Sequence, residues 1–161
     1  MRVPANRSSS AVLLGALLVD CSCSLIAVSH SWQYKFLEVV DALLEFARSQ
    51  PAGLGTVAWM DVFCHCQHTK LVPSFDFLTT RFVGLVGDIG HVVTVLLPWN
   101  KPVVLTRTWC VFEVYACMAT WGRFDVAMPA AERSRFLEGM LEDSGVYYKA
   151  LSEINSRQSD L

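Results

Sequence analysis

One carboxylic acid, Glu113, stands alone in a long apolar stretch of the chain. Between the arginines at 107 and 123 it is the only ionisable side chain apart from the weak acids Cys110, Tyr115 and Cys117. Burying an isolated carboxylate costs several kcal/mol, so such a group pairs with a cation, takes up a proton or faces a cavity. Glu113 is therefore the candidate catalytic residue. The alternative is a structural acid that accepts a hydrogen bond from a histidine, an arginine or a loop amide elsewhere in the chain.

A second group of reactive side chains, Cys-His-Cys-Gln-His, occupies residues 64–68. Thiolate and imidazole are the ligands that zinc prefers, but known zinc sites separate two ligand pairs by about a dozen residues or more. We therefore predict no metal site, although Cys64, Cys66 and His68 could share one face with a fourth ligand elsewhere. As a redox pair, Cys64 and Cys66 are one residue closer together than the C-x-x-C motif requires.

Composition and missing motifs exclude several classes of protein. Hydrophobic residues make up 53% of the 161, which is enough for one compact core. The formal net charge is −2 and the charges are scattered, so we expect no nucleic-acid partner. No glycine-rich phosphate-binding motif and no G-x-S-x-G motif is present, which argues against kinases, P-loop enzymes and hydrolases with a nucleophile elbow.

The N-terminal residues leave the location of the protein open. Arg2 and Arg7 precede an apolar run from Ala11 to Val19, an order typical of a secretory signal peptide, but no Ala-x-Ala cleavage pattern follows. The run is too short to span a membrane, so we expect no membrane span. The six cysteines fall in three local pairs, unlike a disulfide framework, and we expect reduced thiols in the cytoplasm. Secretion is the alternative if residues 1–23 are a signal peptide.

Behind this leader, apolar strand-like runs alternate with helix-like stretches, a pattern that predicts a parallel sheet flanked by helices. We expect a domain over 24–155 and a frayed tail over 156–161. The expected strands are 24–28, 55–61, 91–97 and 123–128. The expected helices are 33–49, 74–86, 108–121, 129–142 and 144–155, with that of 108–121 buried on most sides. This order fits an α/β fold with an open, doubly wound sheet of about four parallel strands and helices on both faces.

Ligands of doubly wound sheets bind beyond the carboxyl ends of the strands. Three segments follow those ends: Ser29 to Trp32, Asp61 to Lys70 and Pro98 to Thr108. His30 has a titratable ring that could bind phosphate or orient a carboxylate. The serines beside it could instead cap the helix that follows, whose N-terminus is itself suited to an anion.

Four stretches taken together resemble the TIR (Toll/interleukin receptor) family, in particular divergent TIR-like domains of microbial eukaryotes. They are VSHSW, WMDVFCHCQH, HVVTVLLPW and LTRTWCVFEVY, within a match that covers roughly Ser24 to Met128. Trp109, Cys110 and Glu113 are similar to the W-C-x-x-E signature of the third TIR helix. The second stretch also resembles the fungal heterokaryon-incompatibility domain, a distant TIR relative. The resemblance implies a flavodoxin-like, TIR-like fold.

The same resemblance implies a function and a set of site residues. In TIR domains that cleave NAD, the catalytic glutamate occupies the place of Glu113, and the segment Val62 to Pro73 becomes the mobile loop that controls access and assembly. NAD would be a substrate, and no cofactor is implied. Residues near the strand ends would hold the nucleotide or shield its pocket: Ser29, His30, Trp32, Asp61, Phe63, Trp99 and Trp109. A single carboxylate can suffice, because nicotinamide leaves NAD as a neutral molecule.

Many TIR domains keep the fold without activity, so a second hypothesis stands beside the enzyme. It is a scaffold module of a larger, repeat-containing protein, with self-association or other TIR-like domains as partners. The sequence shows no convincing fifth strand, which favours this alternative. If the chain is an enzyme, Glu113 is expected to face a cleft beside Ser29 and Asp61. If the chain is a scaffold, Glu113 is expected to form an ion pair with no cavity beside it, and the loop around Val62 to Val72 is expected to be apolar and exposed.

Overall fold

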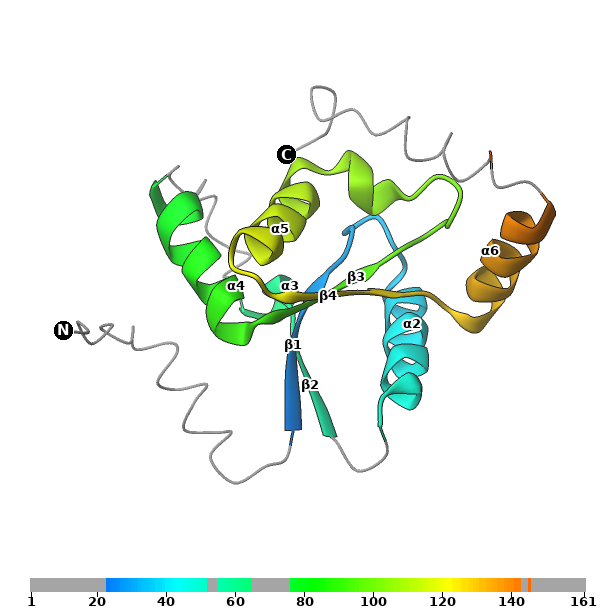
Figure 1. Ribbon diagram of the computed structural model, residues 1–161, viewed down its shortest axis with the longest axis horizontal. Coiled ribbons are helices and arrows are strands. Elements are labelled where there is room, and N and C mark those ends of the chain that lie inside the picture. Colours follow the sequence, from blue (N-terminus) through cyan, green and yellow to red (C-terminus); the bar gives the residue numbers. More distant parts are fainter. Residues whose placement is uncertain (1–22, 52–54, 65–75, 143–144, 146–161) are drawn as a thin grey trace.

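Four parallel strands form one sheet in the order β2-β1-β3-β4 (Figure 1). The computed structural model describes residues 23–51, 55–64, 76–142 and 145. The strands are β1 (Cys23–Ser29), β2 (Gly55–Trp59), β3 (His91–Val95) and β4 (Arg123–Ala127). The chain moves from β1 to one side and then returns to the other side of β1, so the switch point lies between β1 and β3. The α/β flavodoxin-like fold class is confirmed.

The register at the switch point places two polar side chains next to each other. Strands β1 and β3 pair from Ala27 opposite Val92 to Ser29 opposite Thr94. Side chains of directly paired residues lie on the same face of a sheet, so Ser29 and Thr94 are neighbours at its carboxyl edge. Both residues are only 1% exposed.

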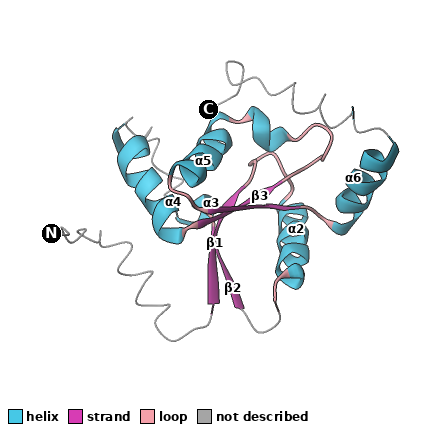
Figure 2. Cartoon of the chain, in the orientation of Figure 1, coloured by secondary structure: helices cyan, strands magenta, loops and turns pink. Residues whose placement is uncertain are grey.

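Helices cover both faces of the sheet (Figure 2). The helices are α2 (Phe36–Ser49), α3 (Asp61–Cys64), α4 (Val83–Ile89), α5 (Thr108–Ala119) and α6 (Ala130–Glu142), with a π-helical turn over Phe77–Phe82 and a 3-10 turn over Val103–Thr106. On one face, the buried side of α2 packs against Ile26 and Val28 of β1. On the other face, α4 and α5 cover Ala27, which alternates with these two residues along β1.

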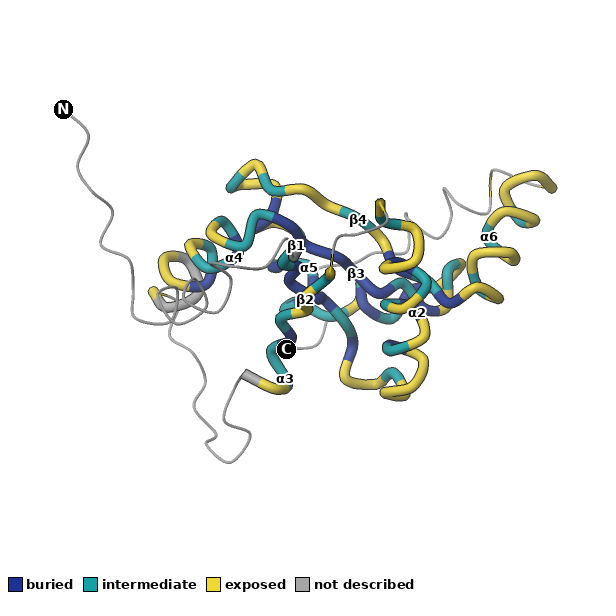
Figure 3. Tube along the Cα trace, turned by 90° about the horizontal axis from the view of Figure 1, so that it is seen from below, coloured by how far each residue is buried: buried dark blue, intermediate teal, exposed yellow. Residues whose placement is uncertain are grey.

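The buried residues follow the centre of the sheet, where the tube in Figure 3 is darkest. All five residues of β3 are buried, as expected for a β-branched, apolar strand between two neighbours. The edge strands are more open: Val57 of β2 is 43% exposed and Val126 of β4 is 40% exposed. No described helix combines the length and the apolar character that crossing a lipid bilayer requires.

Several predicted boundaries were wrong by a few residues. The second strand ends at Trp59, and Asp61 starts α3 instead of ending the strand. The helix expected over 74–86 continues to Ile89. It is terminated by Gly90, whose φ of 70° is the left-handed conformation that glycine adopts easily. The expected leader over 1–23 lies outside the described residues except for Cys23, which begins β1. Nearly all of the helix expected over 144–155 and the tail also lie outside them.

One expectation about α5 was wrong in part. Its residues Cys110, Glu113, Ala116 and Cys117 are buried, but Tyr115 and Met118 on the opposite side are 62% and 63% exposed. The helix therefore has one face on the sheet and one apolar face in solvent. An apolar sequence alone does not distinguish these two environments.

Candidate functional site

The carboxyl end of the β1–β3 pair meets the middle of α5, and Glu113 lies at this junction. Glu113 is only 5% exposed. Burial, the largest cause, raises the pKa of Glu113 from 4.5 to about 8. The Ser29 hydroxyl and the Trp109 side chain lower this pKa, while the negative charge of Asp61 raises it. Glu113 therefore carries a proton at neutral pH, and no described cation forms an ion pair with it.

Three buried side chains at this same junction, Ser29, Thr94 and Glu113, have a polar atom without a partner among the described residues. Among the described residues, such atoms are Ser29 Oγ, His30 Nδ1, Thr94 Oγ1 and Glu113 Oε2. Ser29 and Thr94 are paired across β1 and β3, and the Ser29 side chain influences the pKa of Glu113. The Ser29 hydroxyl thus lies near the carboxyl without a hydrogen bond of normal geometry. Unsatisfied buried groups are rare in folded proteins, and a cluster of them calls for a functional explanation.

His30 connects the end of β1 to α5. Its carbonyl accepts a hydrogen bond from the Cys110 thiol, with a sulfur to oxygen distance of 3.4 Å. Burial lowers the pKa of the His30 ring, and the carboxylate of Asp61 opposes this effect. Burial, with a contribution from Glu113, raises the pKa of Cys110 to about 12. The ring and the thiol are therefore both uncharged at neutral pH.

Tyr34, which no sequence pattern singled out, connects two segments of this edge through its hydroxyl. It donates to the Leu97 carbonyl at 2.6 Å and accepts from the backbone N–H groups of Leu97 at 3.2 Å and Val104 at 3.0 Å. Burial raises the pKa of Tyr34 to about 12, so the hydroxyl keeps its proton. A tyrosine just before an amphipathic helix carries no sequence signal for this role, because its partners lie 63 and 70 residues away.

The structure brings together five of the residues that the sequence analysis selected. Ser29, His30, Asp61 and Trp109 interact with Glu113 or with one another through the contacts and charges given above. The Trp109 ring also packs on Phe82, with ring centroids 4.7 Å apart.

Three further aromatic candidates have no described contact with Glu113. Trp32 is 57% exposed, and Phe63 is 70% exposed and packs edge-on against Phe36. The Trp99 ring packs on Phe136 of α6, with ring centroids 5.7 Å apart, instead of over Glu113. Most of the segment from Val62 to Pro73 lies outside the described residues.

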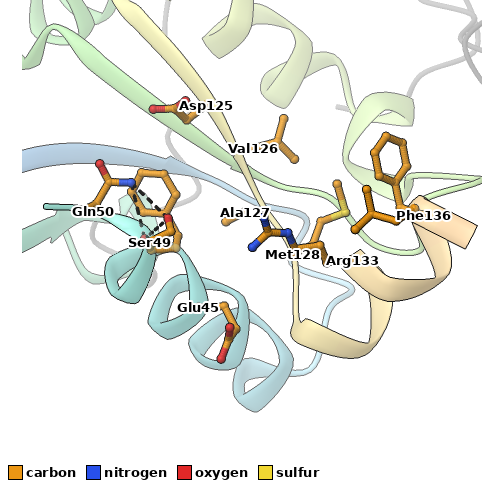
Figure 4. A pocket seen from close by; sticks show the side chains of 11 residues that line it. Glu45, Ser49, Gln50, Asp125, Val126, Ala127, Met128, Arg133 and Phe136 are labelled. Carbon is orange, nitrogen blue, oxygen red and sulfur yellow. Dashed lines mark hydrogen bonds between the residues drawn. The ribbon is translucent and has the colours of Figure 1, made fainter. Parts of the chain in front are cut away.

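Two cavities lined by described residues lie away from Glu113. The larger, of about 360 Å³, is formed by the end of α2, strand β4 and helix α6 (Figure 4). The smaller, of about 190 Å³, lies between α2 and the strands β1 and β2. Glu113 lines neither of these two cavities and is buried, and among the described residues no ion pair of the kind expected for a scaffold forms with it.

The described residues contain no group of three or more histidine, cysteine or acidic side chains that could hold a metal ion. The Cys-His-Cys-Gln-His stretch lies outside them except for Cys64. Comparisons of the chain with protein-family models, with curated proteins and with solved structures found no match. Among the described residues, the junction around Glu113 holds a protonated, buried carboxyl, a second acid, a neutral imidazole and two unpaired hydroxyls.

Proposed function

We propose that the chain is a TIR-like signalling domain that binds NAD and cleaves the bond between nicotinamide and ribose, with Glu113 as the catalytic residue. One observation carries the proposal: among the described residues, three buried polar atoms without a partner, on Ser29, Thr94 and Glu113, belong to neighbouring side chains at the switch point of a doubly wound sheet. Ribose hydroxyls both donate and accept, so they match a carboxyl next to serine and threonine hydroxyls. The resemblance of Trp109, Cys110 and Glu113 to the TIR signature supports the same conclusion.

The reaction needs only one charged group from the protein. The bond between the ribose carbon and the ring nitrogen breaks, and nicotinamide leaves as a neutral molecule with the electron pair of that bond. Positive charge develops on the ribose, and the Glu113 carboxylate stabilises it. Water then adds to the ribose carbon and loses a proton to the carboxylate. The products are nicotinamide and ADP-ribose.

Glu113 must lose its proton before it can act in this way. Its raised pKa follows from burial, and a bound cationic nicotinamide ring would lower that pKa by stabilising the carboxylate. Because the described residues close off the carboxyl, the proposal also requires the strand-end segments to move when the substrate binds. Self-association is the event that we propose to favour this opening.

The test follows nicotinamide release from NAD by the concentrated, purified chain. We expect Glu113→Gln, which keeps the shape of the side chain and removes its charge, to lower the rate by about 100-fold or more. The matched control is Glu138→Gln, because Glu138 is exposed on α6. The wild-type rate is expected to rise with pH through the pKa of Glu113, about 8 in the free chain, as the carboxyl loses its proton.

Equal rates for the wild type and Glu113→Gln would end this proposal. Folding of the variant is checked by circular dichroism, so that a loss of activity cannot be assigned to unfolding. Release that falls in both glutamine variants alike would also contradict a role specific to Glu113.

A non-catalytic scaffold is the second candidate, and one observation favours it. Large apolar side chains lie exposed around the start of α2 and α3: Trp32 at 57%, Phe36 at 57%, Leu37 at 77% and Phe63 at 70%. Exposed apolar groups that lie together are typical of protein contacts. For a scaffold, Phe63→Ser reduces self-association, while neither the wild type nor any variant releases nicotinamide.

A further inference from the structure

Strand β4 is the last strand on its side of the sheet, and part of its backbone has no partner among the described residues. The backbone N–H of Arg123 donates to the carbonyl of Gly90, just before β3, and the carbonyl of Ala127 accepts from the N–H of Leu96, just after β3. The backbone groups of the alternate residues, Phe124 and Val126, therefore point toward the open edge. Their side chains are 38% and 40% exposed. An exposed edge of this kind is a template for pairing with another strand.

Two opposite charges two residues apart mark this edge. The Arg123 Nε and Asp125 Oδ2 atoms are 2.7 Å apart, and the same oxygen lies 2.9 Å from His91 Nε2. Among the described residues, the contacts of this carboxylate are made through Oδ2, which leaves Oδ1 available. Arg123 is itself 58% exposed in its side chain. One positive and one negative group on alternate residues are self-complementary when a strand pairs with an antiparallel copy of itself.

We infer that a second copy of this chain pairs with the first through antiparallel β4 strands, with a two-fold axis at Phe124. In this register Arg123 lies opposite the partner's Asp125, and the reciprocal pair forms on the other side of the axis. Phe124 lies opposite its own copy, and the two backbones exchange hydrogen bonds there. The four strands of each copy then form one continuous sheet across the dimer.

Trp121, just before β4, supports an interface at this edge. It has a φ of 58°, a left-handed conformation that is uncommon for a bulky side chain, and it is 95% exposed. No described contact of its ring accounts for this placement. In the inferred dimer the end of the partner's β4 runs beside Trp121, so part of the exposed ring surface would be covered.

The opposite edge of the sheet lacks these features. Strand β2 has the sequence GTVAW, without a charged residue to fix a register, although its Val57 is exposed to nearly the same extent as Val126. The two edges therefore provide a matched comparison within one molecule. The β4 edge would be the surface for the self-association in the proposed function. The dimer is detected by its mass, so this test does not depend on NAD cleavage.

The experiment measures the mass of the purified chain by analytical ultracentrifugation at concentrations up to about 1 mM, where weak dimers become populated. We expect the wild type to form a dimer, and Phe124→Lys to weaken it about tenfold or more because two like charges meet on the axis. Val57→Lys, on the other edge, is expected to leave the dimer unchanged. Amide hydrogens of Phe124 and Val126 are expected to exchange more slowly as the wild-type dimer forms.

A mixing experiment tests the axis itself. Phe124→Lys and Phe124→Glu are each expected to be monomeric, and an equal mixture of the two is expected to form a mixed dimer because opposite charges then face each other. Regained association also shows that both variants are folded. A wild type that stays monomeric throughout, a dimer lost equally in Val57→Lys, or a mixture that stays monomeric would overturn the inference.

Discussion

At the scale of single residues, the proton on Glu113 couples the stability of the fold to pH. Between pH 4.5, its ordinary pKa, and about 8, its pKa in the folded chain, the unfolded chain releases this proton while the folded chain keeps it. The folded state therefore binds more protons, and the contribution of Glu113 to stability falls as pH rises through this window. At pH 8 and above the loss reaches about 5 kcal/mol, since one pKa unit corresponds to about 1.4 kcal/mol.

The variant Glu113→Gln removes this penalty because its amide never ionises. We expect the free energy of unfolding of Glu113→Gln to exceed that of the wild type by a few kcal/mol at pH 8, and to match it more closely at pH 5. Urea unfolding of both proteins at the two pH values provides the measurement. The lowered pKa of His30 acts in the opposite direction, but it is common to both proteins and cancels in the difference.

An identical response of the two proteins to pH would show that the Glu113 carboxyl is not held in the buried environment described above. Glu138→Gln is again the control, and no pH-dependent difference from the wild type is expected for it.

A second prediction at this scale concerns the Tyr34 hydroxyl. Tyr34→Phe leaves the carbonyl of Leu97 and the N–H groups of Leu97 and Val104 without the hydrogen bonds that they now make. We expect a loss of about 2 to 3 kcal/mol in the free energy of unfolding, because unsatisfied polar groups in partly buried positions are costly. Tyr115→Phe serves as the control, since Tyr115 is 62% exposed. Equal effects in urea unfolding would contradict the role of Tyr34.

At the scale of elements, two helical glycines have opposite surroundings. A methyl group at Gly84 of α4 would meet no atom within 4 Å, whereas one at Gly139 of α6 would lie 2.7 Å from the Trp99 ring. We expect Gly84→Ala to stabilise the chain by about 0.5 to 1 kcal/mol, because alanine favours the helix. Gly139→Ala is expected to destabilise it by about 1 to 2 kcal/mol, because the ring or the helix must shift. Thermal unfolding measures both, and a stabilising Gly139→Ala would contradict the packing of α6 on Trp99.

The sequence predicted elements well where a local pattern determines them. Strand β3 was expected from its β-branched residues between Gly90 and Pro98, and helix α2 from apolar residues at intervals of three and four. Ends were less predictable, as Gly87 lies inside α4 while Gly90 ends it. The exposed side of α5 was not predicted, because its apolar sequence is compatible with burial on every side.

At the scale of the whole molecule, the alternation of strands and helices predicted a doubly wound sheet, and the sheet order confirms that fold class. The rule that ligands bind at carboxyl ends also selected Ser29, His30 and Asp61, which lie near Glu113. The rule could not place Trp99, because its loop leads into α5 while its ring packs on Phe136 of α6, an element that comes later in the chain. Nor could it predict the pairing of Ser29 with Thr94, which depends on the register of two strands distant in sequence.

The reactivity of the two thiols of α5 can report on the opening of this molecule. Cys110 and Cys117 are free, buried and shifted toward the uncharged form, and thiols react with alkylating reagents as thiolates. Alkylation of either sulfur therefore requires the contact between α5 and the strands to loosen, and Glu113 is buried in that same contact. The rate at which these sulfurs are labelled would report how often the closed junction becomes accessible, without any knowledge of what enters it.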